Sequence, residues 1–319
     1  MVKKIGILTS GGDAPGMNAA IVGAIRTGYK LGKAMYVIYG GYKGLVEGKI
    51  VKADINFGEN DLPHGGTCIK SARLNEFKDP EVRKKGIENL KKEGIEALIV
   101  IGGDGSFMGA KKLSEEGINC VGIPSTIDND ISSTDITIGF DTALNNICKA
   151  IDQISETMSS HNRCVVIQVM GNRCPDLTLY AGIACNVDFI LTIDSPLSMK
   201  DLIKGLKEKK ANGQDHVVVL VAEKLLNTAE LVRTINIETG WDTREDVLGY
   251  IQRGGTPSAM ERFNAVRMGS YAIELLDKGI GGVTVGIIDN KLTYNDIYDA
   301  LKMPRNKHDE LYRTFDLIK

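Results

Sequence analysis

Two apolar runs between residues 97 and 130 constrain the fold more than any other stretch. The first run ends in Gly-Gly-Asp-Gly at 102–105 and is followed by a helical pattern over 106–116. This order predicts a buried parallel strand that leads through a glycine loop into a helix N-terminus, where backbone amides bind phosphate-sized anions. The second run, from residue 121, ends in Thr-Ile-Asp-Asn-Asp at 126–130. Because the carboxyl ends of parallel strands share one edge of a sheet, we expect both ends to line one ligand site.

The residue types at these two ends indicate the chemistry of the expected site. A carboxylate at Asp104, inside an anion-binding loop, would repel a bare phosphate. It suits the loop if Mg²⁺ lies between the carboxylate and the phosphates, which favours a metal–nucleotide complex over free phosphate. A glycine loop beside Thr126, Asp128 and Asp130 has the groups that phosphoryl transfer to an alcohol needs.

Strand-length apolar runs alternate with helical patterns along the whole chain, which indicates an α/β class with mostly parallel sheets. No low-complexity linker separates the halves, so we expect an intimate two-domain body. The expected strands are 3–9, 34–39, 97–101, a run from 121, 164–170, 188–192, 216–222, 247–251 and 282–288, and the main expected helices are 80–93, 106–116, 141–158, 176–185, 199–211, 228–239 and 258–276.

Several other residues near expected strand ends could bind a ligand, although each has an ordinary structural interpretation. Gly11 and Gly12 let backbone amides approach an anion, or they form a common strand-to-helix turn. Tyr42 could stack on a nucleotide base, or it could be an ordinary tyrosine at the rim of the site. Arg73 could bind a phosphate with its planar guanidinium group, or it could be a solvated surface arginine. In the second half, the expected strand ends carry Arg163, Glu223, Arg244 and Arg253. Several arginines near strand ends suit a second, fixed phosphate on the acceptor.

Composition excludes several function classes. The chain has 319 residues, enough for two compact units that share a ligand cleft. Its net charge of −2 gives no support for nucleic-acid or membrane binding, and no apolar run reaches the length of about 20 that a membrane span needs. The six cysteines include no Cys-x-x-Cys pair, which favours reduced thiols in a cytoplasmic protein, and the four histidines are too scattered for an obvious metal site.

Four separated motifs, in order along the chain, closely resemble the bacterial 6-phosphofructokinase family. They are Ser10-Gly11-Gly12-Asp13-Ala14-Pro15-Gly16-Met17-Asn18, Gly102-Gly103-Asp104-Gly105-Ser106, Pro124-Ser125-Thr126-Ile127-Asp128-Asn129-Asp130 and Gly249-Tyr250-Ile251-Gln252-Arg253-Gly254-Gly255. The resemblance implies two similar Rossmann-like three-layer domains with the active site in the cleft between them. It further implies a homotetramer whose sugar-phosphate site a neighbouring subunit completes.

The implied reaction moves the γ-phosphoryl group of MgATP to the 1-hydroxyl of fructose 6-phosphate. The implied domains are 1–138 plus 251–303 for the nucleotide and 139–250 plus 304–319 for the sugar phosphate.

The implied nucleotide contacts are Gly12, Tyr42, Arg73, Leu74, Gly103, Asp104, Gly105 and Ser106, with Asp104 holding Mg²⁺. The implied catalytic residues are Asp128 as general base, Thr126, Asp130 and Arg73. The implied substrate contacts are Thr126, Asp128, Arg163, Met170, Gly171, Asn172, Arg173, Glu223, Arg244, Tyr250 and Arg253, of which Arg163 and Arg244 would reach the 6-phosphate across a subunit interface.

Gly105 and Ser125 also indicate the phosphoryl donor. Pyrophosphate-using relatives carry aspartate and lysine at these two positions. Gly105 leaves room for the α-phosphate of a nucleotide, so the resemblance implies ATP.

Three residues at the implied sugar site depart from the family pattern. Asn172 stands where the family has arginine, Pro175 where it has glycine, and Tyr250 where it has histidine. One hypothesis is that Arg173 replaces the missing charge; another is that the acceptor is a different ketose 6-phosphate such as tagatose 6-phosphate.

The implied effector site departs further, which predicts weak or absent regulation by ADP and phosphoenolpyruvate. Arg26 and Asp188 match the family. The family's basic residues are replaced by Val22, Ile55, Ser155 and the pair Gln214-Asp215. A polyanion would therefore lack most of its counter-charge. Lys70, which lies between Thr67 and Arg73, also departs from the family pattern, and nothing in the sequence explains it.

Two other functions remain open from the sequence. A non-catalytic or weakly catalytic paralogue that binds nucleotide and modulates a partner would fit the changes at Asn172 and the effector site. The presence of both Asp128 and Asp130 argues against that function, because a non-catalytic protein has no need to keep both carboxylates. An enzyme like NAD kinases or lipid kinases would fit the Gly-Gly-Asp-Gly loop alone, but not the segment 126–130.

Overall fold

The computed structural model describes residues 2–194, 197–304 and 308–319, and the chain divides into two compact units. Unit 1 comprises Met1–Ile127, Ile131–Thr142 and Arg253–Arg305, and unit 2 comprises Asp128–Asp130, Ala143–Gln252 and Asn306–Lys319. The predicted domain boundaries after 138, 250 and 303 lie near these divisions, whereas Asp128–Asp130 group with unit 2. The roles of the two domains in binding nucleotide and sugar phosphate remain predictions.

Within the described residues, unit 1 is built on an eight-stranded sheet in the order β12-β11-β5-β4-β1-β2-β3, with β6 beside β5. The central pairs are parallel, and antiparallel pairs close both edges, β2 with β3 and β11 with β12. Its strands are β1 (Lys4–Thr9), β2 (Ala34–Ile38), β3 (Ile50–Lys52), β4 (Ala97–Gly102), β5 (Asn119–Thr126), β6 (Ile138–Gly139), β11 (Val283–Ile288) and β12 (Lys291–Asp296).

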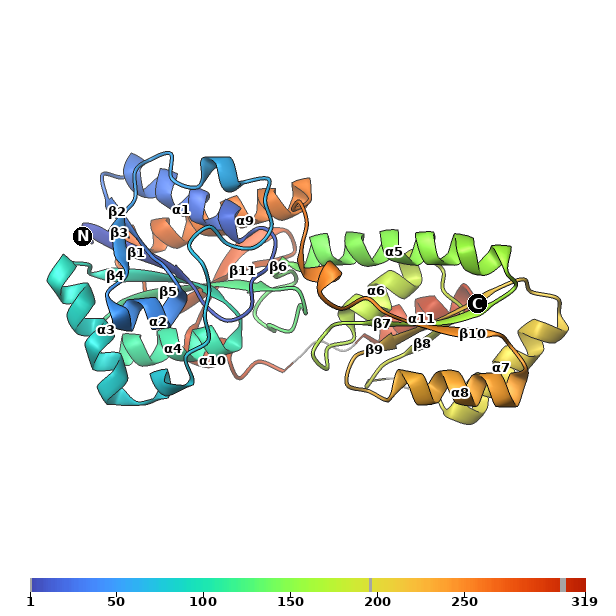
Figure 1. Ribbon diagram of the computed structural model, residues 1–319. Coiled ribbons are helices and arrows are strands. Elements are labelled where there is room, and N and C mark those ends of the chain that lie inside the picture. The colour runs from blue at the N-terminus through green and yellow to red at the C-terminus, as the bar shows by residue number, and fades with distance from the viewer. Residues whose placement is uncertain (1, 195–196, 305–307) are drawn as a thin grey trace. The chain divides into compact units, whose positions relative to one another are not determined.

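Helices cover both faces of the unit 1 sheet (Figure 1). One face carries α1 (Met17–Lys30) and α9 (Ala259–Asp277). The other face carries α2 (Gly41–Glu47), α3 (Pro80–Glu93), α4 (Asp104–Glu115) and α10 (Ile297–Ala300). The connections contain two short 3-10 helices, η1 (Glu59–Asp61) and η2 (Asn75–Lys78). A buried cluster that includes Leu8, Leu98, Val100 and Phe107 joins the sheet to the second group of helices.

Glycines bring α1 and α9 into close backbone contact. A Cβ atom at Gly23 would clash with the carbonyl oxygen of Val266, and one at Gly269 would clash with that of Ala20. Beside this crossing, the Thr27 hydroxyl donates a hydrogen bond to the hydroxyl of Ser270 at 2.9 Å. The last long segment of the chain is therefore an integral part of unit 1.

Unit 2 has, in the part of the chain that is described, a four-stranded parallel sheet in the order β10-β7-β9-β8. Its strands are β7 (Cys164–Val169), β8 (Phe189–Leu191), β9 (Val217–Ala222) and β10 (Thr243–Val247). Its helices are α6 (Asp176–Ala184), α7 (Met199–Ala211), α8 (Thr228–Thr239) and α11 (Asp309–Leu317), and α5 (Phe140–Ser160) belongs to it from Ala143 onward. A second buried cluster, which includes Leu206, Val219, Ile235 and Trp241, joins α7 and α8 to this sheet.

The predicted α/β class with mostly parallel sheets is confirmed, and most expected elements form within a few residues of their predicted bounds. The prediction of a strand over 247–251 is wrong. The strand is β10, whose polar sequence Thr-Arg-Glu-Asp-Val lies at the sheet edge, and the next turn is the 3-10 helix η3 (Gly249–Arg253). Gly249 has a φ of +53°, and the side chains of Tyr250 and Ile251 are exposed, so this apolar run does not form a buried strand.

None of the helices in the described parts of the chain has the length and apolar character that a membrane span requires.

Candidate active site

In unit 1, the register of three parallel strands brings both glycine loops to one sheet edge. Thr9 at the end of β1 pairs with Ile101 of β4, and Gly102 pairs with Pro124 of β5. The Ser10 amide continues this ladder by donating to the Ile101 carbonyl at 3.0 Å. Thr126, the last residue of β5, therefore lies at the edge where the two loops begin.

The loop after β4 is fixed to its neighbours through Ser106. The Ser106 hydroxyl donates to the carbonyl of Ser10 at 2.9 Å, which joins the two glycine loops. The Tyr42 hydroxyl donates to the Ser106 carbonyl at 2.6 Å, and the buried Tyr42 ring stacks on Phe77 with centroids 4.1 Å apart. Burial raises the pKa of Tyr42 well above 10, so its hydroxyl remains a donor. Tyr42 thus holds the first turn of α4 in place, and a contact with nucleotide remains a prediction.

The N-terminus of α4 is open where a phosphate chain would lie. A Cβ atom at Gly103 or Gly105 would meet nothing within 4 Å, and the helix has no side-chain cap. Asp104 is exposed in the first turn. Mg²⁺ in nucleotide sites takes one or two protein carboxylates, phosphate oxygens and water. The exposed carboxylate of Asp104 beside the open helix N-terminus is compatible with that ligand set, so these residues fit a magnesium nucleotide.

The loop after β1 is bordered by an ion pair. Arg253 contacts the Asp13 carboxylate at 2.7 Å, and a Cβ atom at Gly12 would lie 2.8 Å from the Arg253 guanidinium. Ser71 donates to the Gly11 carbonyl at 2.8 Å, which brings the segment before Arg73 to the same loop. Arg73 itself is exposed, and Leu74 packs partly buried against the unit 1 core.

In unit 2, the acidic segment contacts the loop after β7. The Asn129 side-chain amide donates to Asp176 at 2.8 Å, and the Asn172 amide lies 3.4 Å from the Asp130 carboxylate. Asn129 has a left-handed φ of +53°, which turns the chain between Asp128 and Asp130. The structure thus brings the predicted residues Asp130 and Asn172 together.

The loop after β7 also meets the end of β9. The Asn172 backbone amide donates to Glu223 at 2.9 Å, and the Lys224 ammonium donates to the Asn172 side-chain carbonyl at 2.6 Å. The Met170 amide donates to Gln252 at 3.0 Å. Sequence reasoning missed Lys224, although it directly follows Glu223 at a strand end.

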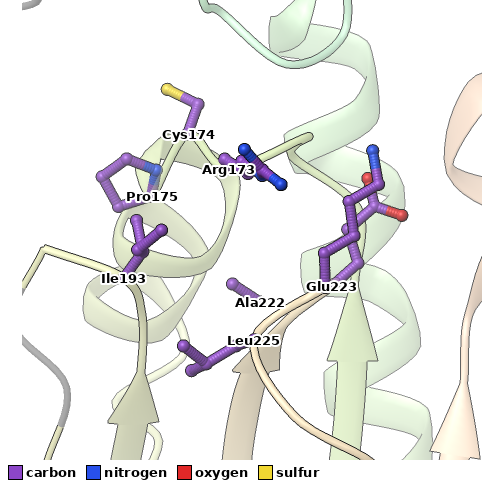
Figure 2. Close-up of a pocket in the computed structure, with 8 residues that line it drawn as sticks. Arg173, Cys174, Pro175, Ile193, Ala222, Glu223 and Leu225 are labelled. Carbon is purple, nitrogen blue, oxygen red and sulfur yellow. The ribbon is translucent and has the colours of Figure 1, made fainter.

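A small hollow lies beside these contacts at the carboxyl ends of the unit 2 strands (Figure 2). It is lined by Arg173, Cys174, Pro175, Ile193, Ala222, Glu223, Lys224 and Leu225. Gly171, Asn172 and Arg173 all have positive φ values, so this loop has a specific, tightly turned backbone.

Arg163 and Arg244 lie at the opposite end of the unit 2 sheet. Arg163 precedes β7, Arg244 is the second residue of β10, and Thr243 pairs with Cys164. Both guanidinium groups contact the Asp242 carboxylate, at 2.7 and 3.0 Å. Glu223 follows the carboxyl end of β9, so the structure does not bring these arginines together with Glu223 within the unit.

The comparison with known proteins identifies the family. The sequence model of one family, described as Phosphofructokinase, matches residues 4–276. This chain belongs to the phosphofructokinase family. An ATP-dependent 6-phosphofructokinase of Vibrio campbellii is 50% identical over 314 residues, which are 98% of each chain. One from Photobacterium profundum is 49% identical over 319 residues, 100% of each chain.

A solved phosphofructokinase structure from Saccharomyces cerevisiae matches the fold with a TM-score of 0.89 and 34% identity. The match covers 98% of this chain and 47% of the yeast chain, so this chain spans about half of that relative. The similarity extends through both units, which agrees with the family match over 4–276.

The predicted effector residues Arg26 and Asp188 make contacts within the chain. Arg26 pairs with Glu59 at 3.0 Å. Asp188 accepts hydrogen bonds from Gln214 and from the Val218 amide, each at 2.8 Å, and pairs with Lys209 at 2.8 Å. Weak or absent effector control remains a prediction.

Proposed function

We propose that this chain is an ATP-dependent 6-phosphofructokinase that converts fructose 6-phosphate to fructose 1,6-bisphosphate in glycolysis. The observation that carries this proposal is the register of β1, β4 and β5, which delivers both glycine loops and Thr126 to one sheet edge. Relatives near 50% identity over almost the whole length, named as this enzyme, support it.

In this proposal, the residues at the α4 N-terminus hold the phosphoryl donor. The backbone amides after Gly103 face the phosphates, since the dipole of α4 favours an anion at this end. Asp104 would hold Mg²⁺, which when bound neutralises charge on the phosphate oxygens. The Arg73 guanidinium would add a fixed positive charge near the transferred group.

Asp128 is the proposed general base. A primary alcohol is a weak nucleophile, and a carboxylate within hydrogen-bond reach can take its proton as the new bond forms, a contribution of about 10²–10⁴ in rate. Thr126 and Asp130 flank this carboxylate in sequence and would position the acceptor. The shared cleft between the domains is part of the proposal.

The proposed enzyme assembles from several copies, as the sequence predicts. Arg163 and Arg244 are at the far end of the unit 2 sheet from Glu223. If these arginines bind the 6-phosphate, they must reach the site of a neighbouring subunit. We extend the proposal to a cytoplasmic homotetramer on this basis.

A direct assay tests the function. Purified protein with MgATP and fructose 6-phosphate is expected to release ADP, measured by a coupled reaction, and Asp128→Ser is expected to lower kcat by about 10²–10⁴-fold. Thermal unfolding of the variant checks that it remains folded. A wild-type chain that binds ATP and releases no ADP would instead support the non-catalytic paralogue.

A second acceptor is favoured by one specific observation. Position 172, where the family pattern has a charged arginine, is the neutral Asn172. It contacts Glu223 and Lys224, so Lys224 is the nearby positive charge. Tagatose 6-phosphate should therefore be assayed beside fructose 6-phosphate, and the ratio of kcat/KM values decides the preference. The Arg173→Ala variant tests whether Arg173 supplies the missing charge, since unchanged kinetics would exclude that role.

A further inference from the structure

A buried carboxylate in unit 2 accepts hydrogen bonds from three different segments. Asp176, the first residue of α6, is 5% exposed. Its carboxylate accepts from His308 Nε2 at 2.9 Å, from the Cys174 thiol at 3.0 Å and from the Asn129 amide at 2.8 Å. Burial alone would raise the pKa of Asp176, but these hydrogen bonds hold the pKa below its usual value, so the group stays ionised. An ionised carboxylate accepts stronger hydrogen bonds than a neutral one.

His308 comes from the C-terminal part of the chain, immediately before α11. Its side chain is largely buried, and its Nδ1 atom lies 3.8 Å from the Asp194 carboxylate. Among the described residues, the titratable groups that interact with the imidazole are Asp176 and Asp194. Cys174 and Tyr312 lie near the same two carboxylates. Hydrogen bonding and charge from the two aspartates raise the pKa of His308 above its ordinary value of 6.5, against the opposing effect of burial.

Asn129 connects this cluster to the proposed catalytic segment. It lies between Asp128 and Asp130 in a left-handed conformation, with φ at +53°. Such a conformation is unfavourable for residues other than glycine and asparagine, and it persists where side-chain contacts fix it. The bond from Asn129 to Asp176 is such a contact.

We propose that Asp176 and His308 are positioning residues that hold Asn129, and with it the carboxylates of Asp128 and Asp130, in the catalytic geometry. His308 acts through Asp176, and Asp176 acts through Asn129. The inference rests on the proposed kinase function for its kinetic consequence. Its structural consequence, an ordered segment 126–131, does not.

The inference has a definite pH direction. Protonated His308 forms ion pairs with Asp176 and Asp194, whereas the neutral imidazole keeps at most a hydrogen bond. As pH rises through the raised pKa of His308, the segment around Asn129 should loosen and kcat should fall. A displacement of about 1 Å at a catalytic group can cost about 100-fold in rate, so we expect a loss of about 10- to 100-fold in His308→Ala.

Three variants and one matched control test the inference in the full-length enzyme. His308→Ala should lower kcat with the KM for ATP nearly unchanged. His308→Gln, which can still donate to Asp176 but carries no charge, should have at every pH about the kcat that the wild type keeps once His308 is neutral, and should lose the decline of kcat with rising pH. Asn129→Gly keeps the left-handed backbone and removes the amide, so it should also lower kcat. The control is His216→Ala, because His216 forms an exposed pair with Asp215 at 2.8 Å.

Hydrogen–deuterium exchange separates this inference from the proposed function. Amides of 126–131 should exchange at least several-fold faster in His308→Ala than in the wild type, and at the wild-type rate in His216→Ala. This result would support the positioning role even if the wild-type chain were not a kinase. Wild-type exchange in both His308→Ala and Asn129→Gly, or pH profiles of His308→Ala and His308→Gln identical to that of the wild type, would overturn it.

Discussion

Glu261, in the first turn of α9, is a buried carboxylate that holds the start of α5. It accepts hydrogen bonds from the backbone amide and the hydroxyl of Thr142, both at 3.1 Å. The Ser258 hydroxyl caps the helix by accepting from the Glu261 amide at 3.0 Å. Burial is the main cause that raises the pKa of Glu261 to about 7, so the folded protein binds a proton here that the unfolded chain releases at lower pH.

This raised pKa predicts a pH dependence of stability. Between about pH 4.5 and 7 the folded state binds more protons at Glu261, so its contribution to the free energy of unfolding decreases as pH rises, by about 3 kcal/mol at most. Glu261→Gln should remove this slope in urea unfolding measured from pH 4.5 to 8. The exposed Glu238→Gln is the control, and equal slopes in wild type and Glu261→Gln would contradict the prediction.

At the residue scale, the sequence predicted the side chains of the proposed chemistry, but it did not predict the hydrogen bonds that position them. Thr126 ends a strand, and Asp104 and Asp128 come within two residues after a strand. These positions can be predicted from apolar runs. The bond from His308 to Asp176 joins residues 132 positions apart, and no local pattern records it. Arg163 precedes its strand, so sequence proximity to a strand did not reveal which sheet edge it occupies.

At the scale of elements, α4 is the helix whose start decides the ligand. The helical pattern predicted a start at residue 106, but the helix begins at Asp104, so two residues of the glycine loop are its first turn. The first amides of a helix have no partner within it and can bind an anion. In α4 these are the amides of Asp104 and Gly105, since the Ser106 amide already donates to the Gly103 carbonyl at 2.9 Å. The predicted phosphate loop and the helix N-terminus are therefore one structure.

Gly105→Asp tests this element. The new side chain meets no atom within 4 Å of its Cβ and Gly105 has no positive φ, so the fold should be unaffected. The added carboxylate would occupy the proposed phosphate space and repel the donor, so KM for ATP should rise by at least tenfold with an unchanged melting temperature. Lys112→Gln changes the net charge equally at the other end of α4, and a similar KM in both variants would contradict the phosphate assignment.

Edge strands were the elements that the sequence predicted least well. In β10, an exposed edge, polar residues occupy a strand, whereas the apolar residues that follow form an exposed turn. A strand that is buried on only one side lacks the continuous apolar run by which central strands such as β4 and β9 are recognised. The antiparallel edge strands β3 and β12 were missed for the same reason.

At the scale of the whole molecule, the positions of Arg163 and Asp128 allow a complementation experiment. Asp128→Ser and Arg163→Ala homo-oligomers should each have low activity. If a site takes Asp128 from one subunit and Arg163 from another, mixed oligomers contain some sites with both native residues. Refolding the two variants together should recover part of the wild-type activity, up to about half of the sites in a mixed pair.

The control for this experiment mixes Asp128→Ser with Asp130→Ala. These two residues come from one segment of one subunit, so no mixed site is fully native and activity should not return. Recovery in neither mixture would contradict the shared site.

The unit to which the N-terminus belongs cannot complete its core from N-terminal residues alone. Strand β5 pairs with β11, and α1 packs against α9. Helix α9 begins more than 200 residues after the end of α1, so neither contact can form until late in synthesis. The strands of unit 2 in the described part of the chain, by contrast, all lie between Cys164 and Val247. During synthesis, when contiguous segments fold as they emerge from the ribosome, the N-terminal strands of unit 1 thus stay without their final neighbours until the whole sheet of unit 2 has been made.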